Sequence, residues 1–174
     1  MEMFEWYVIR ATGIVAFLLL YVSVITGLYS QIQKQRKQNM SGTLFLHEAL
    51  SDWALYLTFG HVVVTLMDKY MTFNLIEVLM PFATDYKPIP MSIGIIAMYF
   101  LIMTILTSKA RKKIGLQKWR KLHALNPIIY IFVMLHWIFM GTDVQGTILA
   151  AINIVPFILI ISMMRDKQRL PQAS

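Results

Sequence analysis

The stretch His47–His61, HEALSDWALYLTFGH, places two histidines inside an apolar segment that is long enough to cross a membrane. Fourteen residues of α-helix advance by about 21 Å and return the second side chain to within about 40° of the first. Both imidazoles therefore face the same neighbour. The positions between them on that face are small: Ser51, Ala54 and Thr58.

Two interpretations of this histidine face are open. Small residues between two histidines leave room for a flat group. Alternatively, a second helix packs closely against the small residues, and each histidine is hydrogen-bonded to a backbone carbonyl or a hydroxyl. The helix by itself does not separate the two interpretations.

Composition places the chain in a membrane. It has 174 residues, of which 57% are hydrophobic and 14% are charged, against about 45–50% and about 25% in soluble domains. We predict one all-α domain over residues 1–174, with five transmembrane helices in a bundle. The predicted helices are Trp6–Ser30, Leu44–Met67, Met91–Ser108, Leu122–Met140 and Gly146–Met164. The first follows Glu2 and Glu5 rather than a basic segment and is too long for a signal peptide, so we expect it to be retained.

The distribution of basic residues predicts the topology. Most of the 16 Lys and Arg fall on one side of a five-helix zigzag. They lie in the first loop (Lys34, Arg36, Lys37), in the segment Lys109–Lys121, and in the tail (Arg165, Lys167, Arg169). The positive-inside rule makes that side cytoplasmic, with the N-terminus outside. The net charge of +7 then reports topology, and we expect no nucleic-acid partner.

The segment Leu122–Met140 carries the other two of the four histidines, His123 and His136. Because it runs in the same direction as Leu44–Met67, His123 shares the inner level with His47, and His136 shares the outer level with His61. Two histidine pairs at matched depths are what two six-coordinate haems require. Thirteen residues turn the second ring by about 140°, so we expect Pro127 to kink or rewind the helix between them. With no cysteine in the chain, thiolate-held clusters are excluded.

Polar residues near the helix ends give further predictions. Arg10, about one turn inside the first helix, either snorkels outward or holds an anion such as a haem propionate. Ser41 or Thr43 can cap the second helix. The long connection 68–90 is expected to contain a short interfacial helix.

The two acids near the start of the second membrane helix, Glu48 and Asp52, need a cation nearby, for which Arg120 or Lys121 could serve. The third predicted helix, Met91–Ser108, has no ionisable residue and is interpreted as scaffold.

The spacings H-x13-H and H-x12-H, preceded by an Arg-Ala-Thr-Gly entry at residues 10–13, resemble the ferric reductase-like transmembrane domain. NADPH oxidases, ferric reductases and the haem-binding membrane subunit of bacterial methionine sulfoxide reductase share this domain. The resemblance extends from Arg10 to about Asp143. It implies two b-type haems with bis-histidine ligation, electron transfer from the cytoplasmic to the outer face, and a position for Arg10 near the outer haem and acceptor. The implied ligand pairs are His47 with His123 and His61 with His136.

The full-length enzymes of this family continue into cytoplasmic flavin and nicotinamide domains, whereas about ten residues follow Met164 and no G-x-G-x-x-G is present. We therefore expect an electron-transfer subunit of a bacterial cytoplasmic membrane that depends on a separate donor. A cytoplasmic flavoprotein reductase, which would supply the flavin, or membrane quinol could be that donor. The outer acceptor is ferric iron, oxygen or a partner protein.

Two alternatives remain. One is a quinol-oxidising subunit of a periplasmic reductase. The other, from a different class, is a small transporter or assembly factor that uses the histidines as metal or proton sites.

Overall fold

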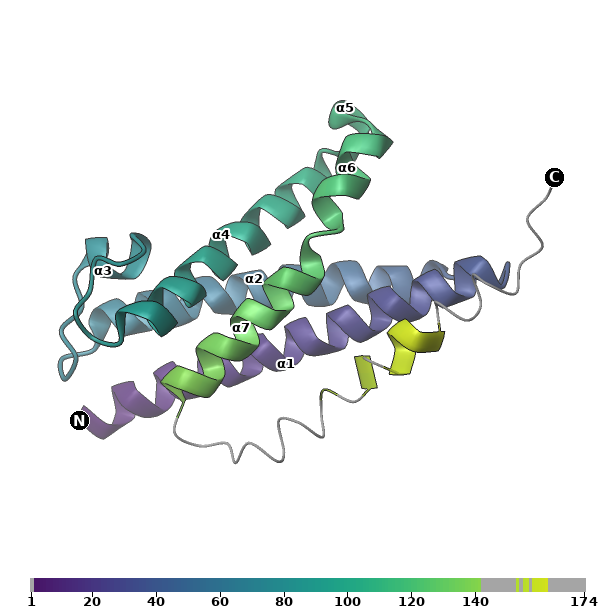
Figure 1. Ribbon diagram of the computed structural model, residues 1–174. Coiled ribbons are helices and arrows are strands. Elements are labelled where there is room, and N and C mark those ends of the chain that lie inside the picture. Colours follow the sequence, from purple (N-terminus) through teal and green to yellow (C-terminus); the bar gives the residue numbers. More distant parts are fainter. Residues whose placement is uncertain (1, 142–152, 154, 157, 163–174) are drawn as a thin grey trace.

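The structure, a computed structural model, describes residues 2–141, 153, 155, 156 and 158–162. Within these residues all regular structure is α-helical, as predicted. The helices are α1 Glu2–Gln35, α2 Ser41–Met67, α3 Leu75–Leu79, α4 Pro88–Lys109, α5 Arg111–Ile114, α6 Leu116–His123 and α7 Asn126–Met140 (Figure 1).

The described chain contains four segments that are long and apolar enough to cross a membrane: α1, α2, α4 and the continuous stretch Leu116–Met140 that holds α6 and α7. These correspond to the first four predicted membrane helices, and the protein is a multi-pass membrane protein. The prediction of a fifth helix at Gly146–Met164 falls largely outside the described residues. Those described within it, at 153, 155–156 and 158–162, are helical.

The long helices form two antiparallel pairs, α1 with α2 and α4 with α7 (Figure 1). One buried cluster joins the two pairs and takes residues from all four helices: Leu20, Ala54, Leu101, Ile105 and Ile129. Ala54, one of the small residues between the two histidines of α2, is almost completely buried in it, at 1% exposure. The small face of α2 is therefore a helix-packing face.

A break separates α6 from α7. Helix α6 ends at His123, Ala124 and Leu125 form a turn, and α7 begins at Asn126, one residue before Pro127. Proline has no N–H to donate and fits the first turn of a helix, so a new helix starts at Pro127 more easily than the old one continues. The predicted interruption between His123 and His136 is confirmed.

The connection between α2 and α4 contains the short helix α3, as predicted. Its N-cap Asn74 accepts hydrogen bonds from the N–H groups of Ile76 and Glu77, and the Glu77 side chain accepts one from the N–H of Asn74, which completes a capping box. At the same end of the bundle the Lys87 ammonium donates to the Phe139 carbonyl at 2.9 Å, which ties the start of α4 to the end of α7.

Two local predictions at the opposite end were wrong. Neither Ser41 nor Thr43 caps α2: the N-cap is Met40, the N–H of Ser41 in the first turn donates to the Asn39 side chain at 3.0 Å, and the Thr43 hydroxyl donates to Gln33 and to the Met40 carbonyl. The two acids of α2 also pair with other cations than the predicted Arg120 or Lys121. Lys109 lies 2.9 Å from Asp52, and Arg111 lies 3.6 Å from Glu48, because the end of α4 and the start of α5, rather than α6, lie beside these acids.

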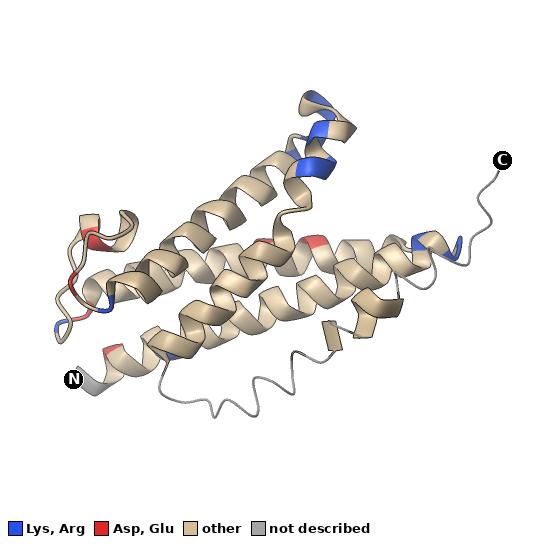
Figure 2. Cartoon of the chain, viewed as in Figure 1, with Lys and Arg blue, Asp and Glu red and all other residues tan. Residues whose placement is uncertain are grey.

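Charge separates the two ends of the bundle. Figure 2 shows Lys and Arg gathered on α5, on α6 and at the C-terminal end of α1, whereas acidic residues lie on α3, on the loops beside it and near the N-terminus; two further acids, Glu48 and Asp52, lie on α2. The two ends of the membrane domain therefore differ in the sign of their charge. We call them the basic end and the α3 end.

Candidate cofactor site

The first histidine pair lies toward the basic end. The rings of His47 on α2 and His123 on α6 have centroids 6.0 Å apart and are nearly perpendicular, at 84°. Both side chains are half-buried. Residues that are 76 positions apart in the chain are thus brought side by side, edge to face, where α6 ends.

The second pair lies toward the α3 end. His61 of α2 and His136 of α7 lie within electrostatic range of one another, and both are half-buried. The four histidines of the chain are therefore arranged as two pairs at two levels. Each pair takes one member from α2 and one from the α6–α7 segment.

Helix α1 holds both histidines of α2 through its backbone. The His47 Nδ1 lies 2.8 Å from the Ser23 carbonyl oxygen, and the His61 Nδ1 lies 3.0 Å from the Ile9 carbonyl oxygen. A carbonyl can only accept, so in both rings Nδ1 carries the hydrogen and Nε2 is left without one in the neutral ring. A second helix packed on the small face of α2, with its histidines bonded to backbone carbonyls, was one of the two interpretations of the sequence. Helix α1 packs in this way, but it uses only Nδ1 of each ring. It leaves Nε2 for another partner.

His136 is held in the same way by a different helix. Its Nδ1 lies 2.8 Å from the carbonyl oxygen of Pro90, in the first turn of α4. Helix α4 was interpreted from the sequence only as scaffold. It is the most buried of the long helices, and it also fixes the orientation of one of the candidate ligands.

His123 is surrounded by side chains instead of a main-chain acceptor. The Trp119 ring lies 5.1 Å from it at an interplanar angle of 32°, and the indole N–H donates to the Ser108 hydroxyl at 3.1 Å. That hydroxyl lies 3.5 Å from His123 Nδ1. The Asn126 amide nitrogen lies 3.2 Å from Nε2 and 3.4 Å from Nδ1. The break between α6 and α7 creates this arrangement, because Asn126 is the first residue of α7.

Arg10 lies at the level of the second pair. It follows Ile9, whose carbonyl oxygen accepts from His61, and its guanidinium lies 4.0 Å from the centre of the Trp6 ring. The side chain is half-buried and stacks on an aromatic residue of its own helix. A cation–π contact of this kind holds a guanidinium in place near a membrane interface.

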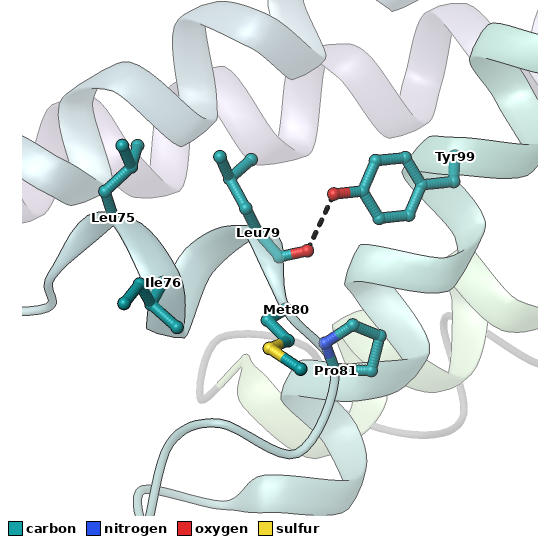
Figure 3. Close-up of a pocket in the computed structure, with 6 residues that line it drawn as sticks. All are labelled: Leu75, Ile76, Leu79, Met80, Pro81 and Tyr99. Atoms are coloured by element: carbon teal, nitrogen blue, oxygen red, sulfur yellow. Dashed lines mark hydrogen bonds between the residues drawn. The ribbon is translucent and has the colours of Figure 1, made fainter.

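An apolar groove of about 480 Å³ lies between α3 and α4, at the α3 end. Figure 3 shows its six lining residues: Leu75, Ile76, Leu79, Met80, Pro81 and Tyr99. The Tyr99 hydroxyl donates to the Leu79 carbonyl at 2.7 Å, so its polar group is already engaged. None of the four histidines lines this groove, and it is not the candidate site.

The fold and the two histidine pairs define a multi-pass helical membrane protein with paired imidazoles inside its bundle. The model of the family described as ferric reductase like transmembrane component matches residues 12–134, which is more than half of the chain. The chain belongs to this family, as the resemblance predicted. The matched range includes His47, His61 and His123, whereas Arg10 and His136 lie just outside it. No curated protein and no solved structure matches the chain.

The residues that hold the histidines were not found from the sequence. They include three glycines at which an added Cβ would meet a ring: Gly13 for His61, Gly27 for His47 and Gly94 for His136. One signal was present. Gly13 and Gly27 are fourteen residues apart, the same interval as His47 and His61. When the two helices pack antiparallel, each glycine can therefore lie opposite one histidine.

Proposed function

We propose that the protein is a diheme b-type cytochrome that relays electrons across a bacterial cytoplasmic membrane. The donor is a cytoplasmic flavin-containing NAD(P)H reductase that meets the basic end, and the acceptor on the other face is ferric iron, oxygen or a partner protein. The observation that carries the proposal is the His47–His123 ring pair at one level of the membrane domain, with His61 and His136 held by the neighbouring helices at the other. Family membership supports it independently.

The separation of the first pair fits one metal ion between the rings. A metal–nitrogen bond is about 2 Å long and the centre of an imidazole lies about 1 Å beyond its nitrogen, so two axial imidazoles have centres about 6 Å apart. The rings of His47 and His123 are 6.0 Å apart.

The donor set also suits a haem better than a bare ion. Among the residues that the structure describes, no three His, Cys, Asp or Glu side chains gather as a metal site. Structural zinc needs four protein ligands and catalytic zinc needs three, whereas a haem carries nitrogen ligands of its own and would need only two histidines from the protein.

The chain's own residues prepare the sites. The Ser23, Ile9 and Pro90 carbonyls hold three imidazoles with Nε2 free, and the core residues between the two levels keep water out. A haem bound at each level would supply a one-electron carrier. Arg10 places a positive charge at the second level, where it would bind a propionate or an anionic acceptor.

The direction of electron flow in the proposal follows from charge. The basic end carries Lys and Arg on α5 and α6, and the positive-inside rule makes that end cytoplasmic. His47 and His123 then form the entry site, and His61 and His136 form the exit site.

The proposal is tested by the spectrum and haem content of the purified protein, followed by reconstitution in vesicles. We expect reduced b-type absorbance bands, two haems per chain, and reduction by a reduced-flavin donor on the basic side. A colourless protein would reject the proposal in favour of a transporter or assembly factor. Two haems reduced by menaquinol but not by reduced flavin would make the chain a quinol-oxidising subunit of a periplasmic reductase.

A further inference from the structure

Three of the four histidines meet their neighbouring helix through the same local arrangement. In each, Nδ1 donates to a main-chain carbonyl, and four residues later on the same helix is a glycine at which an added Cβ would meet the imidazole ring. The sets are Ile9 and Gly13 for His61, Ser23 and Gly27 for His47, and Pro90 and Gly94 for His136. The arrangement occurs on two helices, α1 and α4, and at both levels.

Helix geometry explains the interval of four. The carbonyl of residue i accepts the N–H of residue i+4 along the helix axis and keeps a second lone pair for a donor from the side. Side chains in an α-helix lean toward the N-terminus, so the side chain of residue i+4 covers the turn that contains that carbonyl. A glycine at i+4 has no side chain and leaves the lone pair open.

The distance from a Cβ built on each glycine to the nearby ring atoms shows how poorly that position would accept a side chain. A Cβ at Gly94 would lie 2.6 Å from Cε1 of His136, and one at Gly27 would lie 2.9 Å from Nδ1 of His47. Real Cβ atoms essentially never come this close to other heavy atoms, so the ring would have to move. A Cβ at Gly13 would lie 3.1 Å from Cε1 of His61, which a small displacement can relieve.

We propose that Gly13, Gly27 and Gly94 are positioning residues for the histidine ligands. Each opens the carbonyl four residues before it to the Nδ1–H of one ring and thereby holds the tautomer whose Nε2 binds iron. The inference rests on the proposed function, since it assigns the glycines a role at the two haem sites. The three glycines lie on α1 and α4, which supply no histidine ligand. By keeping the Nδ1–H bonds in place they set the basicity of the ligands and hence the potentials of the haems.

The experiment compares Gly13→Ala, Gly27→Ala and Gly94→Ala with the control Gly60→Ala. Gly60 is in α2 beside His61, and a Cβ there would have no described heavy atom within 4 Å. The readouts are haem per chain and the midpoint potential of each haem, with each potential assigned from the variants that lack a histidine.

We expect Gly13→Ala to raise the potential of the outer haem alone, because a ligand whose Nδ1–H bond is lengthened is less basic and stabilises ferric iron less. Gly27→Ala should raise the inner potential alone and weaken inner haem binding by about 10–100-fold. Gly94→Ala should have the strongest effect and lower the occupancy of the outer haem. Gly60→Ala should match the wild type.

In each variant the haem at the other level reports that the chain has folded. If Gly94→Ala loses both haems, the gentler Gly13→Ala decides the question for the same site. The inference is overturned if Gly13→Ala and Gly27→Ala behave like Gly60→Ala, or if either moves both potentials equally. A wild-type protein without haem would reject the proposed function instead, so the two failures are distinguishable.

Discussion

The two histidine pairs are built differently. At the level toward the α3 end, which our proposal makes the outer one, His61 and His136 are both held by main-chain carbonyls, one from α1 and one from α4. At the inner level only His47 is held in this way. Its partner His123 ends α6 at a break in the helix and is surrounded by the side chains of Trp119, Ser108 and Asn126.

The difference shows which substitutions each site tolerates. A main-chain acceptor cannot be removed by substitution of its own side chain, so the outer site is sensitive to residues that would cover the carbonyl. The inner site depends on side chains that a single substitution can remove. It also lies beside the α6–α7 break, next to the basic end where an electron donor would arrive. The outer site is therefore fixed by the scaffold, and the inner site can be tuned through its neighbours.

The largest effects are expected from loss of a ligand. His136→Ala should remove the outer haem and His123→Ala the inner one, because an iron between two axial imidazoles loses its site when either is absent. Haem per chain should fall to about half in both variants, with a different midpoint potential missing from each. Loss of the same potential in both would show that the two histidines serve one site.

Asn126→Ala should affect the inner site only. It removes the amide that lies 3.4 Å from Nδ1 of His123 but leaves Ser108 and Trp119 in place, so inner haem affinity should fall by about tenfold, at the low end for loss of an outer-shell contact. Haem titration of the apoprotein measures this. Ile138→Ala, an exposed position of α7, is the control, and an equal loss of affinity at both sites would show that the effect is general.

Arg10→Ala should affect the outer site without removing its haem. The guanidinium supplies charge rather than a ligand, and its loss is worth about 1 kcal/mol, or a several-fold slower transfer to an anionic acceptor. Stopped-flow oxidation of the reduced protein measures the rate. Arg10→Lys, which keeps the charge, should recover part of it. Wild-type rates in Arg10→Ala would mean that the arginine is only an interface anchor.

The smallest effect is expected from the ion pair of Asp52 with Lys109. The two side chains are 33% and 58% exposed, and pairs of this kind contribute about 0–1 kcal/mol. Asp52→Asn should therefore shift the thermal unfolding midpoint by no more than a few degrees and leave both potentials unchanged. A changed inner potential would show that this pair, rather than Trp119 and Asn126, controls the inner site.

Much of the fold was predictable because membrane helices depend on long apolar runs, which are visible in composition alone. The histidine levels followed from helix rise, and the interruption at Pro127 followed from the missing N–H of proline. Short-range rules failed where tertiary contacts chose the partner. Thr43 bonds to Gln33 of α1 instead of capping α2, and Asp52 meets the end of α4 instead of α6.

The supporting residues could not be predicted because their role depends on which helix faces which. Gly94 is an ordinary glycine until α4 packs against α7, and Pro90 contributes only its carbonyl, which no residue pattern reveals. The matching intervals of Gly13–Gly27 and His47–His61 were visible. They carried meaning only once α1 was known to lie antiparallel to α2.

The pairing of the histidines is tested most directly by two double variants, measured for haem per chain. His61→Ala/His136→Ala removes both ligands of one site, so it should keep the inner haem and bind as much haem as either single variant. His47→Ala/His136→Ala removes one ligand from each site and should bind none. Loss of both haems in the first double variant and retention of one in the second would contradict the pairing that the structure implies.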